Sequence, residues 1–159
     1  MAEDAKFEDG SEKPLRLRAA DTDDLAVIAA LTQDAVFPAN EMTWDKGQRR
    51  FAILLNRFRW EDLPKAEARK RPYERVQSVL VISDVLKVQS QGVGRGDKDM
   101  VMSLLSIDFT AGADGAGRVI LTFAGDGAIA LDVECLDVAL KDVTRPYIAP
   151  SKSVPKHPE

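Results

Sequence analysis

The sequence has very little of the chemistry on which most enzymes depend. It contains one cysteine, Cys135, and one histidine, His157, which lies in a proline-rich C-terminal stretch. A single cysteine excludes an internal disulfide framework and any zinc site built from several cysteines. A single histidine outside the expected folded elements leaves no base for a Ser–His or Cys–His pair. We therefore predict no catalytic residue, no metal site and no cofactor.

The sequence also lacks the segments that direct a chain to a membrane. Fully apolar stretches such as AILL (52–55) and VLVI (79–82) are far shorter than the ~20 residues that a membrane-spanning helix needs. The acidic N-terminus has neither the basic patch nor the apolar core of a signal peptide. With an unpaired thiol and no export signal, the chain is expected to be soluble and cytoplasmic, without a membrane partner.

Positive charge is scarce overall but concentrated in one region. The net charge is −4. Residues 45–75 carry ten Lys or Arg against five acidic residues, whereas residues 97–143 carry three against nine. An acidic chain is a poor general binder of nucleic acid, because that affinity comes from neutralising phosphates. A local basic region can still hold a single anion or an acidic partner. The alternative interpretation of this region is a solvated loop without a ligand.

The length of 159 residues fits one domain with two tails. Residues 1–13 are charged and polar and are predicted to be disordered. Residues 14–143 are predicted to form a single α+β domain. Residues 144–159 hold four of the eight prolines and form a C-terminal tail.

Hydrophobic spacing predicts a sheet with a helix near each end. LRLRAA (15–20) alternates as a strand, and Asp21 is placed to cap a helix that runs to about Asp34. RRFAILLNRFRW (49–60) is apolar on both faces at its start, which is typical of a central strand. Residues 61–74, bounded by prolines, are expected to form a mobile loop, and residues 134–143 have helical spacing.

This order of elements, without βαβ alternation, indicates an α+β fold on a mainly antiparallel sheet. The alternative is a partly open barrel of the pleckstrin-homology type, closed by the C-terminal helix.

Two glycine-rich segments resemble phosphate-binding loops but lack the context for that role. A dinucleotide loop needs a helix N-terminus after its glycines, and Gly125-Asp126-Gly127 is instead followed by a strand pattern. We interpret it as a hairpin turn, where positive φ favours Gly and Asp. GVGRGD (92–97) links two strand runs in the same way, and its Arg95-Gly96-Asp97 triplet has no meaning in a cytoplasmic chain.

Carboxylates, a thiol and serines offer weaker candidates. Asp132 and Glu134 share a strand face with Asp137 following, and one of them would act as a base only if burial raised its pKa; the alternative is a solvated polar face. Cys135 is expected to be a small buried residue. None of the candidate serines has a folded histidine to activate it, and none stands in S-x-x-K spacing with Lys87 or Lys98. These serines are Ser78, Ser83, Ser90, Ser103 and Ser106.

The remaining candidate is a basic cluster at the end of the central strand. Arginines beside a loop can fix a phosphate, a nucleotide or an acidic protein surface, and a nearby tryptophan can stack on a base. Glu61 and Asp62 follow immediately, which weakens the hypothesis. The residues of this predicted anion site are Arg57, Arg59, Trp60, Arg69, Lys70 and Arg71.

Three segments, RRFAILLNRFRWE, VMSLLSIDF and ILTFAGDGAIALDVECLDVALKDV, resemble a bacterial family catalogued as domain of unknown function 2948. The resemblance covers about residues 15–143, and its F-A-G-x-G-x-I-x-L-x-V-E-C run is fairly specific. It implies a single compact bacterial domain and transfers no catalytic residue.

Three functions stay open on this evidence. The first is a non-enzymatic binding module that acts on a protein partner or by self-association. The second is a domain that binds a small phosphorylated ligand through the basic 57–71 region. The third is an enzyme that relies on carboxylates such as Asp132 or Glu134.

Overall fold

The computed structural model describes residues 13–93, 99–150 and 154–155. The predicted tail 1–13, apart from Lys13, lies outside these ranges, as do Arg95-Gly96-Asp97, Lys98 and His157. Within the described ranges no helix is long and apolar enough to cross a membrane.

The described strands form one open, antiparallel sheet. Its order is β1-β10-β5-β4-β2-β7-β8-β9-β6, with β3 paired to β4 and β11 paired to β5. Every strand pair is antiparallel, which confirms the mainly antiparallel α+β prediction. The strands are β1 (Arg16–Ala19), β2 (Val36–Pro38), β3 (Met42–Asp45), β4 (Arg50–Phe58), β5 (Glu74–Ile82), β6 (Val85–Gln91), β7 (Val101–Ala111), β8 (Gly117–Phe123), β9 (Ala128–Val133), β10 (Val138–Asp142) and β11 (Tyr147–Ile148).

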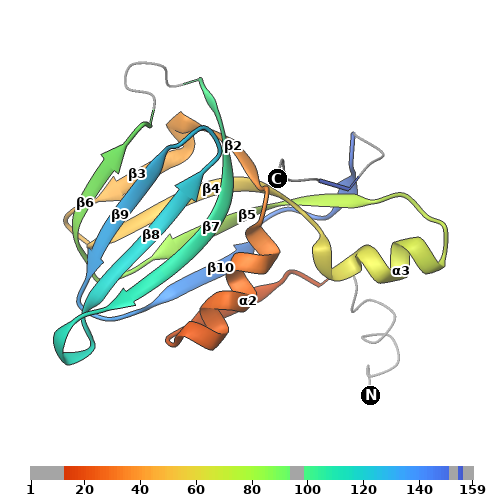
Figure 1. Ribbon diagram of the computed structural model, residues 1–159. Coiled ribbons are helices and arrows are strands. Elements are labelled where there is room, and N and C mark those ends of the chain that lie inside the picture. Colours follow the sequence, from red (N-terminus) through yellow and green to blue (C-terminus); the bar gives the residue numbers. More distant parts are fainter. Residues whose placement is uncertain (1–12, 94–98, 151–153, 156–159) are drawn as a thin grey trace.

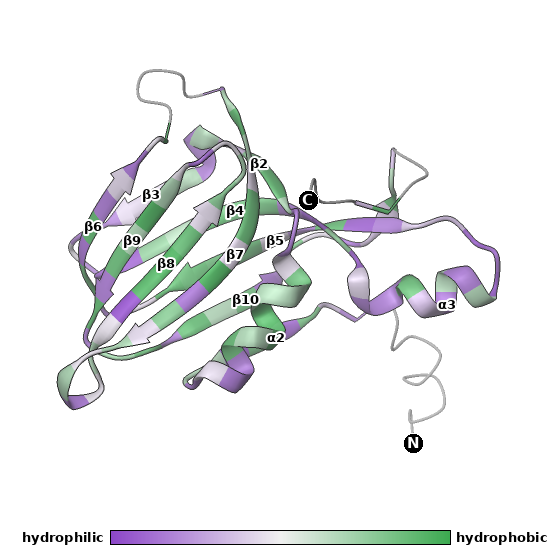
Figure 2. Ribbon diagram, in the orientation of Figure 1, coloured by the Kyte–Doolittle hydropathy of each residue, from purple (hydrophilic) through white to green (hydrophobic). Residues whose placement is uncertain are grey.

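This sheet folds over into two layers. One contains β3, β4, β5 and β10, and the other contains β6, β9, β8 and β7 (Figure 1). The chain crosses between the layers at two neighbouring places, where Ser83 N donates to Asp137 O and Glu134 N donates to Asp84 O. Alternate residues of both layers fill the space between them, and the strands are accordingly rich in hydrophobic residues (Figure 2).

Helix α2 (Thr22–Thr32) packs against β1 and β7 and adds to this core. It begins as predicted: the Asp21 carboxylate accepts a hydrogen bond from Asp24 N at 2.8 Å. Leu25 and Ile28 are buried in the core. Two sequence predictions are thereby confirmed, the N-terminal helix and its cap.

The predicted C-terminal helix over residues 134–143 is wrong. Residues 138–142 form β10, which pairs with both β1 and β5. Val138, Leu140 and Asp142 face inward, while Ala139 and Lys141 face outward. The spacing of a short apolar run fits both a helix and a strand, and here hydrogen bonding to a strand on each side makes it a strand. The analogy with pleckstrin-homology domains loses the helix on which it rested.

Residues 61–74 are also more regular than the predicted mobile loop. Trp60–Asp62 forms a 3-10 turn (η2), and Leu63–Ala68 forms a short helix, α3. Pro64 lies in the first turn of α3, where a missing N–H costs nothing. The second helix of the fold therefore lies in the middle of the chain. The C-terminal stretch contributes β11, and Ala149 N donates to Tyr73 O.

The glycine turn at 125–127 is a hairpin, as predicted. It joins β8 to β9, with positive φ at Gly125 and Asp126, and Phe123 N donates to Gly127 O at 2.8 Å. No helix N-terminus follows it. The central position of β4 is likewise confirmed, because β4 pairs with β5, β3 and β2.

Candidate functional site

The predicted anion site begins with an arginine that faces the interior. Strand alternation places Arg57 on the core side of β4, in register with Val76 of β5. Its side chain is 0% exposed. The guanidinium donates to Ser78 Oγ at 3.0 Å, to both oxygens of Asp142 at 3.0 and 3.1 Å, and to both oxygens of Glu61 at 2.8 Å. Arg57 is thus held by carboxylates of its own chain.

Burial and pairing have opposing effects on these groups. Burial lowers the pKa of Arg57, but the hydrogen bonds and charges of Glu61 and Asp142 outweigh it and raise the pKa. Burial likewise raises the pKa of Glu61, and its hydrogen bond to Arg57 brings the net pKa below its ordinary value. The pair is therefore charged at neutral pH, so Arg57 holds an internal ion pair.

Arg59 and Arg71 are also paired with acidic side chains. Arg59 pairs with Glu74 and lies near Asp62 at 3.9 Å. Arg71 forms a bidentate ion pair with Asp62, and both N–O distances are 2.6 Å. The hydrogen bond from Arg71 lowers the pKa of Asp62. These contacts join η2, β5 and the segment that follows α3 into one polar network.

The structure leaves the other members of the predicted site apart from this network. The Trp60 ring lies against Phe58, with centroids 4.8 Å apart, and Trp60 Nε1 donates to Gln33 O at 3.1 Å. Arg69 and Lys70 are exposed at the end of α3. Three of the six predicted residues are therefore joined by acidic partners. Asp142 was not found from the sequence because it had been assigned to a helix.

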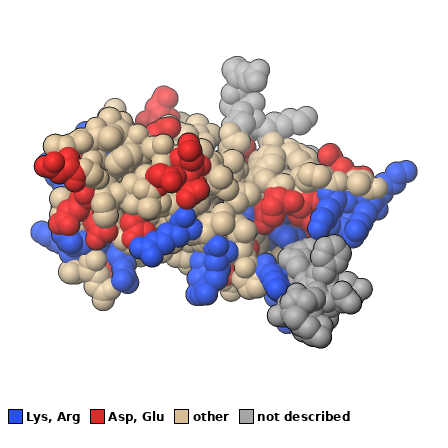
Figure 3. All heavy atoms as spheres, turned by 90° about the horizontal axis from the view of Figure 1, so that it is seen from below, with Lys and Arg blue, Asp and Glu red and all other residues tan. Residues whose placement is uncertain are grey.

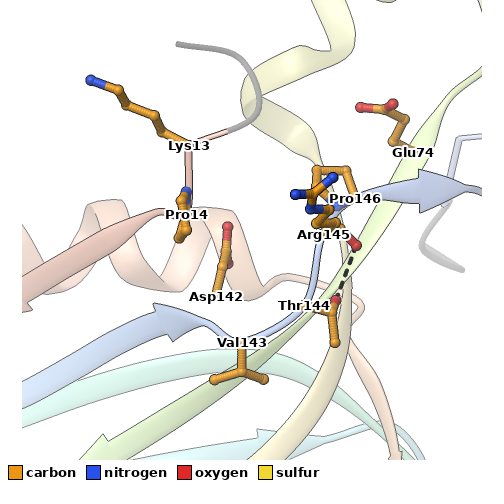
Figure 4. A pocket seen from close by; sticks show the side chains of 8 residues that line it. All are labelled: Lys13, Pro14, Glu74, Asp142, Val143, Thr144, Arg145 and Pro146. Carbon is orange, nitrogen blue, oxygen red and sulfur yellow. Dashed lines mark hydrogen bonds between the residues drawn. The ribbon is translucent and has the colours of Figure 1, made fainter. Parts of the chain in front are cut away.

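A cavity of 710 Å³ borders the network. Figure 4 shows the Asp142 side chain pointing toward Pro14, with Arg145 opposite, and Val143 pointing the other way. The oxygens of Asp142 are already engaged, since they also accept from Leu15 N at 3.0 Å and Ser78 Oγ at 2.6 Å. The residues that line the cavity carry charges of both signs, and their donors do not converge on one point. They are Lys13, Pro14, Glu74, Asp142, Val143, Thr144, Arg145 and Pro146.

The carboxylates proposed for catalysis lie at the surface in ion pairs. Asp132 accepts from Arg118 Nε at 2.8 Å, and Glu134 pairs with Arg49 at 2.5 Å. Asp137 pairs with Arg18 at 2.7 Å. Among the described residues, no group of three or more His, Cys, Asp or Glu is placed to hold a metal ion. These carboxylates lack the burial that a raised pKa requires.

The expectation that Cys135 is buried is wrong, because its side chain is exposed. It follows β9 at the crossing between the layers, and its thiol lies 3.2 Å from Asp84 Oδ2. The hydrogen bond to Asp84, together with desolvation, raises the pKa of the thiol. A raised pKa lowers the thiolate fraction, which disfavours a nucleophilic role.

The outward side of the first layer has a different chemistry. Each inward residue of β4, β5 and β10 alternates with an outward one, and one group of neighbouring outward residues is apolar. Beyond this group the outward pairs are polar, Asn56 with Gln77, or include the charged Lys141 opposite Val79. We call this surface the outer face; it consists of Ala52, Leu54, Val79, Val81 and Ala139. Part of it forms a hollow of 450 Å³ lined by Ala52, Val81 and Ala139 together with Thr43, Asp45, Arg50 and Ser83.

Four basic residues lie at the margin of the outer face. Arg16 and Lys141 face each other across β1 and β10. Arg18 lies opposite Ala139 and pairs with Asp137, and Arg50 lies beside the hollow in register with Asp45. We call these four residues the basic rim. Seen from below, Lys and Arg gather along the margin on the side of this layer, and acidic groups lie above them (Figure 3). The second layer instead places Arg118 against Asp132 on its outward side.

Comparison with known proteins identifies a family but no activity. A family model described as "Protein of unknown function (DUF2948)" matches residues 15–157, nearly the whole chain. No curated protein and no solved structure matches the chain.

Proposed function

The chain belongs to the DUF2948 family, whose description states no activity, and on its own surface chemistry we propose that it is a non-enzymatic protein-interaction module. The outer face is its binding surface. The partner presents apolar side chains to the hollow and acidic side chains to the basic rim. Bacterial origin and a cytoplasmic location are parts of the same proposal.

One observation carries this proposal: an apolar surface on the outward side of a central sheet. Outward residues of a solvated antiparallel sheet are usually polar, because only one side packs on the core. Here Leu54, Val79 and Val81 are neighbours on adjacent strands and are partly exposed. Apolar patches rimmed by polar or charged groups are typical of protein-binding sites.

The alternative of a small phosphorylated ligand has less support. It relied on arginines that converge on an open pocket, whereas Arg57, Arg59 and Arg71 are occupied by carboxylates. The carboxylate-dependent enzyme has less support still, because the partly exposed Asp132 and the exposed Glu134 are paired with arginines.

A photo-crosslinking experiment tests the proposed function. Thr43 is exposed and lines the hollow, so a benzoylphenylalanine at position 43 would touch a bound partner. The matched control places the same residue at Thr110, which is an exposed threonine of β7. We expect a protein adduct from position 43, in the cells that make this protein, and none from position 110.

A second substitution ties the adduct to the outer face. Val81→Asp replaces an apolar side chain of the hollow by a charged one, and we expect it to abolish the adduct from position 43. Equal adducts from both positions, no adduct from position 43, or an adduct that survives Val81→Asp would each contradict the proposal.

A further inference from the structure

Arg75 is held differently from the other described arginines that are fully or partly buried. Each of those pairs with a carboxylate of its own chain: Arg49, Arg57, Arg59 and Arg71. The guanidinium of Arg75, which is partly buried on β5, instead donates from Nε to Asn56 Oδ1 at 2.5 Å and from Nη2 to Asn56 O at 3.0 Å. Asn56 is uncharged, so this contact fixes the position of the guanidinium without balancing its charge.

Strand register gathers two more polar side chains around Arg75, on the outward side of the first layer. Arg75 lies opposite Tyr147 of β11, and Asn56 lies opposite Gln77 of β5. Asn56 Nδ2 donates to the hydroxyl oxygen of Tyr147. One amide therefore holds both the guanidinium of Arg75 and the hydroxyl group of Tyr147 in place.

This cluster has more hydrogen-bond donors than the described residues accept. A guanidinium has five N–H donors, and Asn56 accepts from two of them. The Tyr147 hydroxyl accepts from Asn56, which leaves its own O–H to donate. The side-chain amide of Gln77 makes no hydrogen bond to a described residue. A cation among neutral donors, without a carboxylate, is suited to an anion.

Partial burial increases the gain from such an anion. Burial lowers the pKa of Arg75, and the charges of Tyr147 and Asp34, which raise it, do not offset this effect. A partly desolvated cation gains more from an opposite charge than a hydrated one does. An anion should therefore bind more strongly at Arg75 than at a fully exposed arginine such as Arg69.

The charge and the shape of the cluster favour a carboxylate over a phosphate. One arginine balances the single charge of a carboxylate, whereas a phosphate dianion would keep an uncompensated charge. Asn56 occupies the Nε and Nη2 edge of the Arg75 guanidinium. The edge formed by Nη1 and Nη2 still presents two N–H groups, which match the two oxygens of a carboxylate.

The cluster continues the outer face along the same two strands. Asn56 lies two residues beyond Leu54 on β4, and Gln77 lies two residues before Val79 on β5. The hollow at Val81 is six residues from Arg75, or about 20 Å along the strand. A standard interface of about 800 Å² on each partner is wide enough to cover both.

We propose that Arg75, Tyr147 and Gln77 bind a carboxylate from outside the chain, and that an aspartate or glutamate of the protein partner supplies it. Asn56 acts as a positioning residue for Arg75 and Tyr147. The source of the carboxylate rests on the proposed function, whereas the site itself does not.

Acetate is the probe that tests the site without a partner. Nuclear magnetic resonance follows the guanidinium signals of Arg75 and the ring signals of Tyr147 while sodium acetate replaces sodium chloride at constant ionic strength. Both should show a saturable shift. The guanidinium of Arg118, which Asp132 already occupies, is the internal reference and should not respond. Equal responses at Arg75 and Arg118, or a stronger response at Arg75 to inorganic phosphate than to acetate, would overturn the inference.

Two variants remove the site in different ways. Arg75→Gln removes the cation, and its matched control is Arg69→Gln. Asn56→Asp keeps the cation but gives it an internal carboxylate, as Asp142 does for Arg57; its matched control is Gln89→Glu, on the second layer. Each site variant should weaken the acetate response at least about tenfold, and each control should leave it unchanged. Asn56→Asp is expected to fold, because Asn56 is partly exposed and its replacement is isosteric. A full response in Asn56→Asp would overturn the inference.

The adduct from position 43 identifies the source of the carboxylate. If the partner supplies it, Asn56→Asp should lower the yield of that adduct at least about tenfold, and Gln89→Glu should not. An unchanged yield would overturn the partner as the source. An adduct without any acetate response would leave the proposed function and overturn this inference. An acetate response without any adduct would support the site, for a free carboxylic acid, and overturn both the proposed function and the partner as the source.

Discussion

Arg57 and Arg16 lie on opposite sides of the same layer. Arg57 faces the core and is enclosed by Asp142, Glu61 and Ser78. Arg16 faces outward and is exposed beside Lys141, another basic residue. The comparison teaches that a concentration of arginines in a sequence has no single meaning. Where the same chain supplies the carboxylates, arginine stabilises the fold; where it does not, the charge is available to a partner.

The largest expected effect comes from removing the buried member of this comparison. Arg57→Leu leaves Asp142 buried without its cation, and breaking such a pair typically costs about 3–5 kcal/mol. The free energy of unfolding, measured in urea, should fall by this amount. Arg16→Leu removes an exposed charge and should change it by less than about 0.5 kcal/mol.

A double variant shows whether the loss is due to the unpaired charge. Arg57→Leu combined with Asp142→Leu should be more stable than Arg57→Leu alone, because the buried Asp142 carboxylate is then removed together with its cation, while Glu61 keeps Arg59 at 3.7 Å. If the double variant is the less stable one, the ion pair itself supplies the stability.

The pH dependence of the unfolding free energy tests the carboxylates that pair with the buried arginines. The pKa values of Glu61 and Asp62 are lowered in the folded chain from ordinary values of 4.5 and 3.8. Their contribution to stability is therefore complete above those values and is lost as the pH falls through the folded pKa values. Urea unfolding at a series of pH values should show this loss. Glu61→Gln with Asp62→Asn should flatten the curve below pH 4.5, and an unchanged slope would contradict it.

A substitution in the outer face should change stability little and binding strongly, whereas a substitution in the buried network should change stability strongly. Val81→Asp alters a partly exposed side chain, so we expect a modest loss of stability, about 1 kcal/mol, but complete loss of the adduct from position 43. Circular dichroism and urea unfolding of the same preparation would check that the fold is retained. A loss of stability as large as that of Arg57→Leu would mean that Val81 acts in the fold.

The smallest effect is expected at an exposed ion pair. Asp132 pairs with Arg118, and their side chains are 33% and 48% exposed. Pairs of this kind contribute about 0.2–1 kcal/mol. Asp132→Asn should therefore shift the unfolding free energy by no more than this range, in contrast to Arg57→Leu. A larger shift would show that exposure is a poor guide to which arginines matter.

Local signals predicted the elements that depend on local chemistry. The cap at Asp21, the turn at Gly125-Asp126 and the alternation of β4 follow from backbone and side-chain preferences within a few residues. The short apolar run at 136–143 did not have a unique interpretation. Leu136, Ala139 and Leu140 fit a helix, and only pairing with β1 and β5 makes residues 138–142 a strand.

The candidate site shows the same division. The sequence by itself determined that the chain has almost no thiol or imidazole chemistry, that its arginines concentrate in one region and that its fold is mainly antiparallel. Only the tertiary structure decided which arginines are enclosed and which side of the sheet stays apolar. The physical reason is distance along the chain: Asp142 reaches Arg57 across 85 residues, and Ala52, Val81 and Ala139 become neighbours only through strand register.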